Sequence, residues 1–133
     1  MSKLKHYKAL KGLIQHKGKI LLIETVGFIG GKYELPGGMK LNPKEEDTRF
    51  LKKKILTEVG LEVTVKKRLI RNWLLDLPEK GIHLDLDVFQ CISSSNEVKP
   101  QSAIKSFIWV DKKDIFKYDC PRWVKDTVLK LDK

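Results

Sequence analysis

The chain has 133 residues, of which 41% are hydrophobic and 33% charged, and its formal net charge at pH 7 is +10. This length suits one compact domain and is too short for two ordinary ones, so we expect a single domain over residues 1–133. No apolar run approaches the roughly 18 residues needed to cross a bilayer, which excludes a membrane-spanning helix. The positive charge attracts polyanions in general but selects no partner, because the lysines are scattered along the chain.

The amino-terminal segment, residues 1–8, is basic and leads directly into strand-like sequence. A secretory signal needs an apolar core of about 7–15 residues, and none is present, so we expect no export. The two cysteines, Cys91 and Cys120, are too few for a disulfide framework and lack the spacing of metal ligands. The sequence therefore predicts a cytoplasmic protein with two reduced thiols, and it places Cys91 in a strand.

The first third of the chain predicts a β-hairpin followed by a glycine-rich loop. Residues 7–14 and 19–24 are strand-like and flank a polar turn at residues 15–18. The glycine-rich loop covers residues 27–32, and residues 33–35 form a short strand. We expect this strand to stop at the following Pro-Gly-Gly sequence, because proline lacks a backbone donor and glycine permits positive φ.

A helix is predicted over residues 43–58. Its start is indicated by Asn42 as N-cap, Pro43 at the first helical position and Glu45 in the capping-box position. Its end is indicated by Gly60, which suits the left-handed residue after a helix. One apolar stripe faces the core at three- and four-residue spacing, formed by Thr48, Leu51, Ile55 and Val59.

The second half of the chain predicts further strands and a terminal helix. The strands cover residues 61–65, 69–77, 82–92 and 107–110, and the helix begins at Asp119 or Pro121. Residues 82–92 alternate, with Leu84, Leu86 and Val88 on one face and His83, Asp85, Asp87 and Phe89 on the other. The pattern is that of a mixed α/β sheet with a helix after the glycine loop and another at the end.

Two short segments carry a family resemblance. Residues 33–38 read Tyr-Glu-Leu-Pro-Gly-Gly, and residues 57–61 read Thr-Glu-Val-Gly-Leu. Together they resemble the Nudix box, Gly-x5-Glu-x7-Arg-Glu-U-x-Glu-Glu-x-Gly-U with U a bulky aliphatic residue, of MutT-like hydrolases. The resemblance covers nearly the whole chain and implies the Nudix-type α/β/α sandwich with a mixed sheet. Glu45 and Gly60 match structural positions of the box, although six residues instead of five separate Gly38 from Glu45.

The metal-binding part of the box is degenerate. The Arg-Glu pair of the family falls on Lys53 and Lys54, and the Glu-Glu pair falls on Thr57 and Glu58. Positions 54, 57 and 58 share one helix face, and in the family three carboxylates there hold divalent ions, usually Mg²⁺, against a pyrophosphate. The resemblance therefore implies Glu58 as the catalytic residue and a metal ligand, with the Gly37 carbonyl as a second ligand.

Lys54 opposes a metal ion at this place. An ammonium about 5 Å from a divalent ion costs roughly 6 to 7 kcal/mol at an effective dielectric of about 20, as an upper bound, because a lysine can swing away. We therefore expect Mg²⁺ to bind weakly or not at all. Asp85 and Asp87 are candidates to replace the lost ligands, but strand alternation favours a solvent-facing role for both.

The amides of Gly37 and Gly38, together with Lys53 and Lys54, offer donors and positive charge to a phosphate. The sequence thus favours a protein whose partner is a nucleotide or a nucleoside diphosphate derivative. The first hypothesis is Mg²⁺-dependent hydrolysis by water attack on a pyrophosphate, with reduced activity. The alternative is an inactive Nudix domain that binds a nucleotide or a protein partner. A nucleic-acid-binding module ranks last because the chain has no recognisable RNA or DNA motif.

Overall fold

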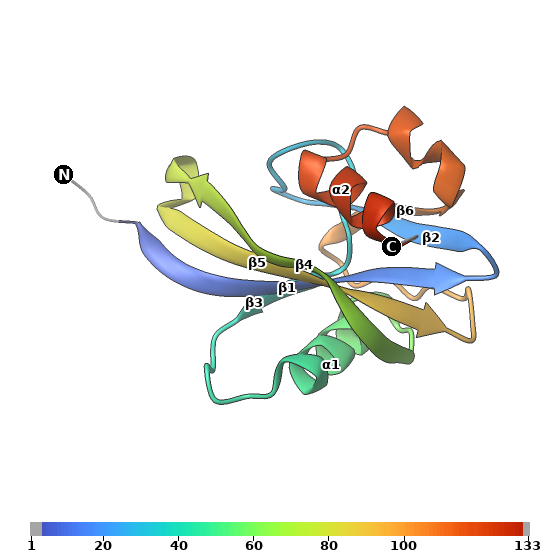
Figure 1. Ribbon diagram of the computed structural model, residues 1–133, viewed down its shortest axis with the longest axis horizontal. Helices are drawn as coiled ribbons and strands as arrows, with labels where there is room; N and C mark the ends of the chain where they lie inside the picture. Colours follow the sequence, from blue (N-terminus) through green and yellow to red (C-terminus); the bar gives the residue numbers. More distant parts are fainter. Residues whose placement is uncertain (1–3, 132–133) are drawn as a thin grey trace.

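A six-stranded mixed sheet with one α-helix on each face forms the described part of the chain, residues 4–131 of the computed structural model (Figure 1). Residues 1–3 of the basic amino-terminal segment lie outside the described residues, as do residues 132–133. The elements in chain order are β1 (Lys5–His16), β2 (Lys19–Thr25), β3 (Gly37–Lys40), α1 (Asp47–Val59), β4 (Val63–Leu77), the 3₁₀-helix η1 (Pro78–Lys80), β5 (Ile82–Ser93), β6 (Ile104–Asp111), the 3₁₀-helix η2 (Lys112–Lys117) and α2 (Arg122–Lys130). Over residues 4–131 no helix is long and apolar enough to span a bilayer.

Strand β1 is the centre of the sheet. The strand order is β4-β5-β1-β2-β6, with β3 paired to β1 outside this path. Strand β1 runs parallel to β5 along its length, but on its other side it pairs with β3 from Lys8 to Lys11 and with β2 only at Gln15 and His16. The exchange of partner from β3 to β2 opens the sheet beside Gly12, whose amide donates to the Pro36 carbonyl at 2.8 Å. The Pro-Gly-Gly segment is thereby fixed at the opening.

The predicted hairpin is confirmed. Strands β1 and β2 are joined by Lys17 and Gly18, with φ of 48° and 79°. Two successive left-handed residues form the type of two-residue turn that matches the twist of antiparallel strands. The apolar run Ile20 to Ile23 of β2 is fully buried, as its sequence predicts.

The predicted helix start is wrong by four residues, because α1 begins at Asp47. The Asn42 side chain accepts from the Lys44 amide at 3.0 Å, and its carbonyl accepts from the Glu45 amide at 3.1 Å. Asn42 therefore closes a separate turn ahead of the helix instead of capping it. The predicted end is confirmed, since Gly60 has φ of 73° and donates to the Leu56 carbonyl at 3.0 Å.

The predicted strand at residues 33–35 is reduced to a single bridge between Glu34 and Ile23, and β3 lies one step later. The glycines do not end a strand but begin one. A Cβ on Gly37 would lie 2.1 Å from the Leu10 carbonyl oxygen and 2.7 Å from the Lys11 Cα. Only glycine lets the chain lie this close to β1 and pair with it.

The two strands predicted between residues 61 and 77 form one strand, β4, interrupted by register shifts after Val65, Arg68 and Ile70. The terminal helix follows the prediction, with Pro121 in the N-cap position of α2. Strand β6 is longer than predicted and extends from Ile104 to Asp111.

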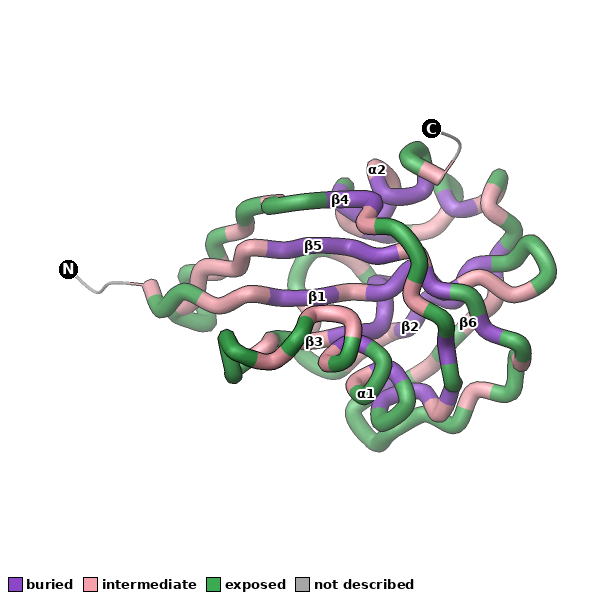
Figure 2. Tube along the Cα trace, turned by 60° about the horizontal axis from the view of Figure 1, so that its bottom comes forward, coloured by how far each residue is buried: buried purple, intermediate pink, exposed green. Residues whose placement is uncertain are grey.

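Two apolar cores lie on opposite faces of the sheet, and the purple segments in Figure 2 trace them along the middle of β1, β4 and β5. Helix α2 covers one core with Trp123, Val124 and Val128, and α1 covers the other with Leu51, Ile55 and Val59. Trp73 packs against the first core and Phe89 is buried in the second, so core packing accounts for both aromatic side chains. Burial raises the pKa of Cys91, a β5 residue, to about 12 and that of Cys120 to about 11, which keeps both free thiols protonated at neutral pH.

Candidate functional site

The last turn of α1 is fastened to the Pro-Gly-Gly segment by Glu58. Its Oε1 atom accepts from the Gly37 amide at 2.9 Å, and the residue is only 9% exposed. The structure therefore brings together Gly37 and Glu58, the two residues assigned to a metal site. The contact differs from the expected one, because the carboxylate meets the Gly37 amide, whereas the family resemblance implies metal ligation by the carbonyl.

Lys54 lies directly against Gly38. A Cβ on Gly38 would be 2.7 Å from the Lys54 Cε and 3.5 Å from its Nζ. The ammonium is thus held beside the glycine backbone, at a helix position where the family resemblance implies a carboxylate. Lys53 forms an ion pair with Glu45, and a pocket of about 350 Å³ is lined by Glu45, Phe50, Lys53, Lys54 and Thr57. Of the assigned phosphate-binding residues, Lys53 and Lys54 therefore line one concave surface, and Lys54 extends from it to Gly38.

A buried ion pair that sequence reasoning missed lies on the other side of the same segment. Lys11 Nζ is 2.7 Å from Glu34 Oε1, and the two side chains are 16% and 6% exposed. Lys11 occupies a core-facing position of β1, between Ala9 and Leu13. A charged residue in an apolar alternation was the signal for such a pair, with Glu34 inside the Tyr-Glu-Leu-Pro motif as the candidate partner.

The environment of Glu58 favours its neutral form. Burial raises the pKa of this carboxyl group above its usual value of 4.5, and the nearby Glu34 carboxylate adds to the rise. Lys11, the Gly37 amide and Lys54 act in the opposite direction and lower this pKa. The remaining helix carboxylate therefore resists the charged form that metal binding requires.

We expect Glu58→Gln to change how stability depends on pH. The raised pKa means that the folded state binds more protons than the unfolded state between pH 4.5 and the folded pKa. Wild-type stability should therefore fall as pH rises through this window, and the variant should lack this component. Urea unfolding of both proteins between about pH 4 and pH 8 measures the difference, which should grow with pH and then level off. Parallel pH profiles for the two proteins would contradict the assignment.

The expectation that Asp87 faces solvent is wrong. Asp87 is 2% exposed, with Oδ1 2.7 Å from Lys8 Nζ and Oδ2 3.1 Å from Arg68 Nε. Asn72, at the irregular part of β4, donates its amide to Asp87 at 2.8 Å, and its side chain donates to Asp85. The register shifts of β4 bring Arg68 and Asn72 into contact with Asp87 of the neighbouring strand β5. The oxygens of Asp85 and Asp87 are therefore engaged by lysine, arginine and asparagine, and they do not supplement the metal ligands.

The donor set around the glycine segment does not fit a tightly held Mg²⁺. Three carboxylates lie near it, and each has a nearby lysine: Glu34 with Lys11, Glu45 with Lys53, and Glu58 with Lys54 and Lys11. Within residues 4–131, no three His, Cys, Asp or Glu side chains are grouped so that they could hold a metal ion. Mg²⁺ takes about six oxygen ligands and competes poorly with resident ammonium groups.

An apolar pocket of about 240 Å³ opens on the α2 side of the sheet. Lys11 and Glu34 contribute charge to its lining, and Lys80 of η1 contributes another charge and donates to the Gly27 carbonyl at 2.7 Å. Met39, the residue after Gly38, also lines it, so β3 separates this pocket from the Lys54 side of the glycine segment. The apolar and aromatic lining includes Phe28, Leu75, Leu84, Leu86 and Trp123.

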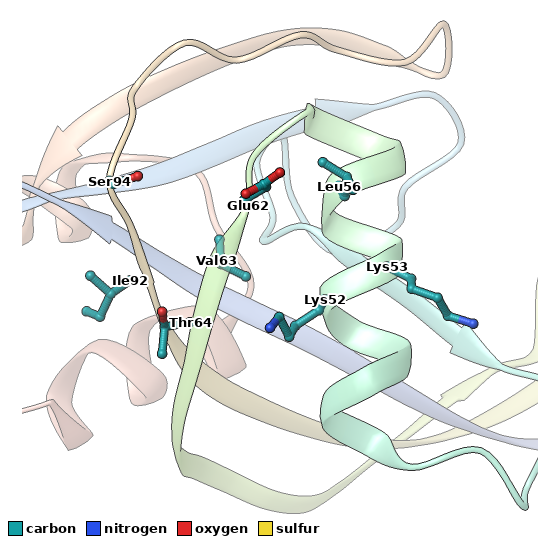
Figure 3. Close-up of a pocket in the computed structure, with 8 residues that line it drawn as sticks. All are labelled: Lys52, Lys53, Leu56, Glu62, Val63, Thr64, Ile92 and Ser94. Atoms are coloured by element: carbon teal, nitrogen blue, oxygen red, sulfur yellow. The ribbon is translucent and has the colours of Figure 1, made fainter.

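A larger and more open groove of about 610 Å³ lies between α1 and the neighbouring ends of β4 and β5 (Figure 3). It is lined by Lys52, Lys53, Leu56, Glu62, Val63, Thr64, Ile92 and Ser94. In Figure 3 the Lys52 side chain points toward Thr64, while Lys53 points away from the strands. Gly37, Lys54 and Glu58 do not line this groove, so the candidate site is the glycine segment with the apolar pocket beside it.

The fold defined by this sheet, its two helices and the glycine segment is that of the Nudix hydrolases. The MutT protein of Methanosarcina mazei superposes with a TM-score of 0.81 at 20% identity, covering 99% of this chain and 96% of that one. An ADP-ribose pyrophosphatase of Streptococcus suis superposes with a TM-score of 0.68 at 16% identity, covering 96% and 92%. At these identities, the matches establish the fold.

Sequence similarity adds to the structural match. The nucleoside triphosphatase NudI of Escherichia coli is 27% identical over 120 residues, covering 80% of this chain and 83% of that protein. No family model matches the chain. The chain is therefore similar in sequence to a NudI nucleoside triphosphatase and similar in fold to MutT-like Nudix proteins.

Proposed function

We propose that this protein binds a nucleoside diphosphate derivative, with its phosphates contacted by lysines beside the glycine segment, and that it hydrolyses this ligand slowly. The observation that carries the proposal is the position of Lys54, whose ammonium lies against Gly38 at a helix position where the family carries a carboxylate. Lysine there retains affinity for phosphate while removing a metal ligand.

The apolar pocket supports a nucleoside as the ligand. Its volume of about 240 Å³ is below the roughly 300–1,000 Å³ of sites that enclose a drug-sized molecule, so it suits one planar base instead of a complete nucleotide. Phe28 offers an aromatic face, and Leu75 and Leu84 offer apolar contacts. A base seated there leaves the phosphates outside the pocket, where charged groups are available.

The glycine segment supports a diphosphate next to the base. Lys11 and Met39 both line the pocket. Lys11 pairs with Gly37 across β1 and β3, and Met39 follows Gly38 in the sequence. A phosphate chain leaving the pocket must pass around β3 to reach Lys54, which lies against Gly38 on the other side of that strand. The relatives named above act on nucleoside triphosphates and on ADP-ribose, which are ligands of this shape.

We expect hydrolysis to be slow because the face of α1 that points to the glycine segment has few carboxylates. Of the three positions 54, 57 and 58, only Glu58 has a carboxylate, and burial together with its hydrogen bond to Gly37 already engages it. Family enzymes hold divalent ions there to activate water and neutralise phosphate charge, a task that requires several oxygen ligands. Glu58 is the residue that we assign to any remaining hydrolysis.

Calorimetric titration with ADP-ribose and with nucleoside diphosphates, in the presence and absence of EDTA, tests the binding. We expect the affinity to survive EDTA, because lysine ammonium groups bind phosphate without a metal ion. It should weaken with added salt, because partly exposed ion pairs are screened over about 8 Å at physiological ionic strength. Lys54→Ala should reduce the affinity about tenfold, equivalent to about 1.4 kcal/mol. Absence of heat in both conditions, or unchanged affinity in Lys54→Ala, would remove phosphate binding through Lys54 and favour the protein-partner alternative.

A further inference from the structure

We propose that Lys11 is the counterion of the buried carboxylates Glu34 and Glu58, and that it prevents divalent metal ions from binding to these two carboxylates. The proposal is independent of nucleotide binding. It concerns the free protein and can be tested without a nucleotide.

The three side chains meet at one short segment of backbone. Lys11 is the register partner of Gly37 in the pairing of β1 with β3, and its Nζ is 2.7 Å from Glu34 Oε1. Glu58 accepts from the Gly37 amide at 2.9 Å. Glu34 is fixed by two backbone hydrogen bonds with Ile23, at 2.8 and 2.9 Å. The Glu58 carboxylate thus contacts Gly37, and the Glu34 carboxylate contacts Lys11, the residue of β1 that pairs with Gly37.

The electrostatics agree with this geometry. Lys11 and Glu34 both lie close enough to Glu58 to shift its pKa, and they do so in opposite directions. Two carboxylates with a divalent ion would balance in charge, whereas the same pair with Lys11 and a divalent ion would carry excess positive charge in a poorly solvated place. Coulomb repulsion at such sites is larger than at the surface.

Lys11 differs from Lys54 in that it has little freedom to leave. Its side chain is 16% exposed, and it projects from β1, which is paired on both sides at this point. Lys54 is at an intermediate depth on a helix and can swing toward solvent. The tethered ammonium of Lys11 is therefore the more effective barrier to a metal ion.

A lysine that only stabilises the fold would give a different result from one that excludes metals. In the first case, neutralising Lys11 destabilises the protein and leaves metal binding unchanged, because the cost is an unpaired buried carboxylate. In the second case, the same substitution frees Glu34 and Glu58 for a divalent ion, and that ion restores part of the lost stability.

Paramagnetic Mn²⁺ is the probe, and the broadening of backbone amide signals in NMR spectra is the readout. In the wild type, the signals of Gly37 and Glu34 should stay sharp at Mn²⁺ concentrations that broaden exposed acidic surface positions. In Lys11→Met, both signals should broaden, and Mn²⁺ should bind at least tenfold more tightly by calorimetry. The double variant Lys11→Met/Glu34→Gln is the matched control and should lose this gain.

Lys11→Gln covers the case in which Lys11→Met does not fold, because glutamine keeps a donor for Glu34 without the charge. It should show the same gain in Mn²⁺ affinity. The wild-type spectra decide the proposal if neither variant folds, since sharp Gly37 and Glu34 signals support it and selective broadening of both overturns it. A folded Lys11→Met or Lys11→Gln protein with wild-type Mn²⁺ affinity would also overturn it.

Discussion

Replacing Lys54 and Thr57 with glutamate should raise Mg²⁺-dependent hydrolysis of nucleoside diphosphate derivatives by at least about 100-fold, a barrier reduction of about 2.7 kcal/mol. The two substitutions place carboxylates four residues and one residue before Glu58, on one helix face. They also remove the Lys54 ammonium, whose repulsion of a nearby divalent ion is at most roughly 6 to 7 kcal/mol. The rate of substrate cleavage, measured by chromatography of the products, and the Mg²⁺ affinity should increase together in the double variant.

The matched control is Lys52→Glu/Leu56→Glu. This control changes the net charge by the same amount on the same helix. Lys52 and Leu56, however, line the groove shown in Figure 3 and do not adjoin the glycine segment. Leu56 is 48% exposed, so the change leaves the core intact. Hydrolysis in this control should stay at the wild-type level. An equal rise in both double variants would mean that overall charge, and not the helix-face carboxylates, limits the reaction.

Gly37→Ala should destabilise the fold by about 3 kcal/mol or more, because positive-φ strain and overpacking each cost about 1–3 kcal/mol. The residue has φ of 143°, and its new Cβ would lie 2.1 Å from the Leu10 carbonyl oxygen. The Cβ would also lie 2.7 Å from the Lys11 Cα. Both of these atoms belong to the backbone of the central strand β1 and have little room to move. The free energy of unfolding from urea titration measures the loss.

Gly18→Ala separates the two causes. Gly18 also has positive φ, at 79°, but no atom lies within 4 Å of its added Cβ. This variant should therefore lose only about 1–2 kcal/mol, the cost of left-handed backbone for alanine. Equal losses in the two variants would show that close packing of Gly37 on β1 does not contribute.

Local signals in the sequence predicted the parts of the fold that depend on neighbouring residues. The hairpin at Lys17 and Gly18, the stop at Gly60 and the apolar stripe of α1 all follow from turn chemistry and helical spacing. The helix start failed because Asn42 can close a turn as readily as it can cap a helix, and the choice depends on where the preceding strand ends. The position of strand β3 was predicted wrongly because its pairing with β1 is a contact between segments that are distant in the sequence.

The candidate site shows the same division. The approach of Glu58 to Gly37 and of Lys54 to Gly38 could be expected, because the family resemblance places the helix face of positions 54, 57 and 58 beside the glycine segment. The pairing of Lys11 with Glu34 spans 23 residues and depends on strand register, which no local pattern supplies. Asp87 was misplaced for a related reason, because strand alternation carries no information about the irregular β4 segment that covers it.

Mg²⁺-dependent cleavage of the phosphoanhydride bond by the wild type, followed by chromatography of the products from nucleoside triphosphates, nucleoside diphosphates and ADP-ribose with Glu58→Gln as control, tests the central claim most directly. The claim is that lysines hold the phosphates where the family holds metal ions. It predicts turnover below about 1 s⁻¹ on every compound, with any residual activity lost in Glu58→Gln. Turnover of about 1 to 10³ s⁻¹ on any of them, which is typical of enzymes, would contradict it.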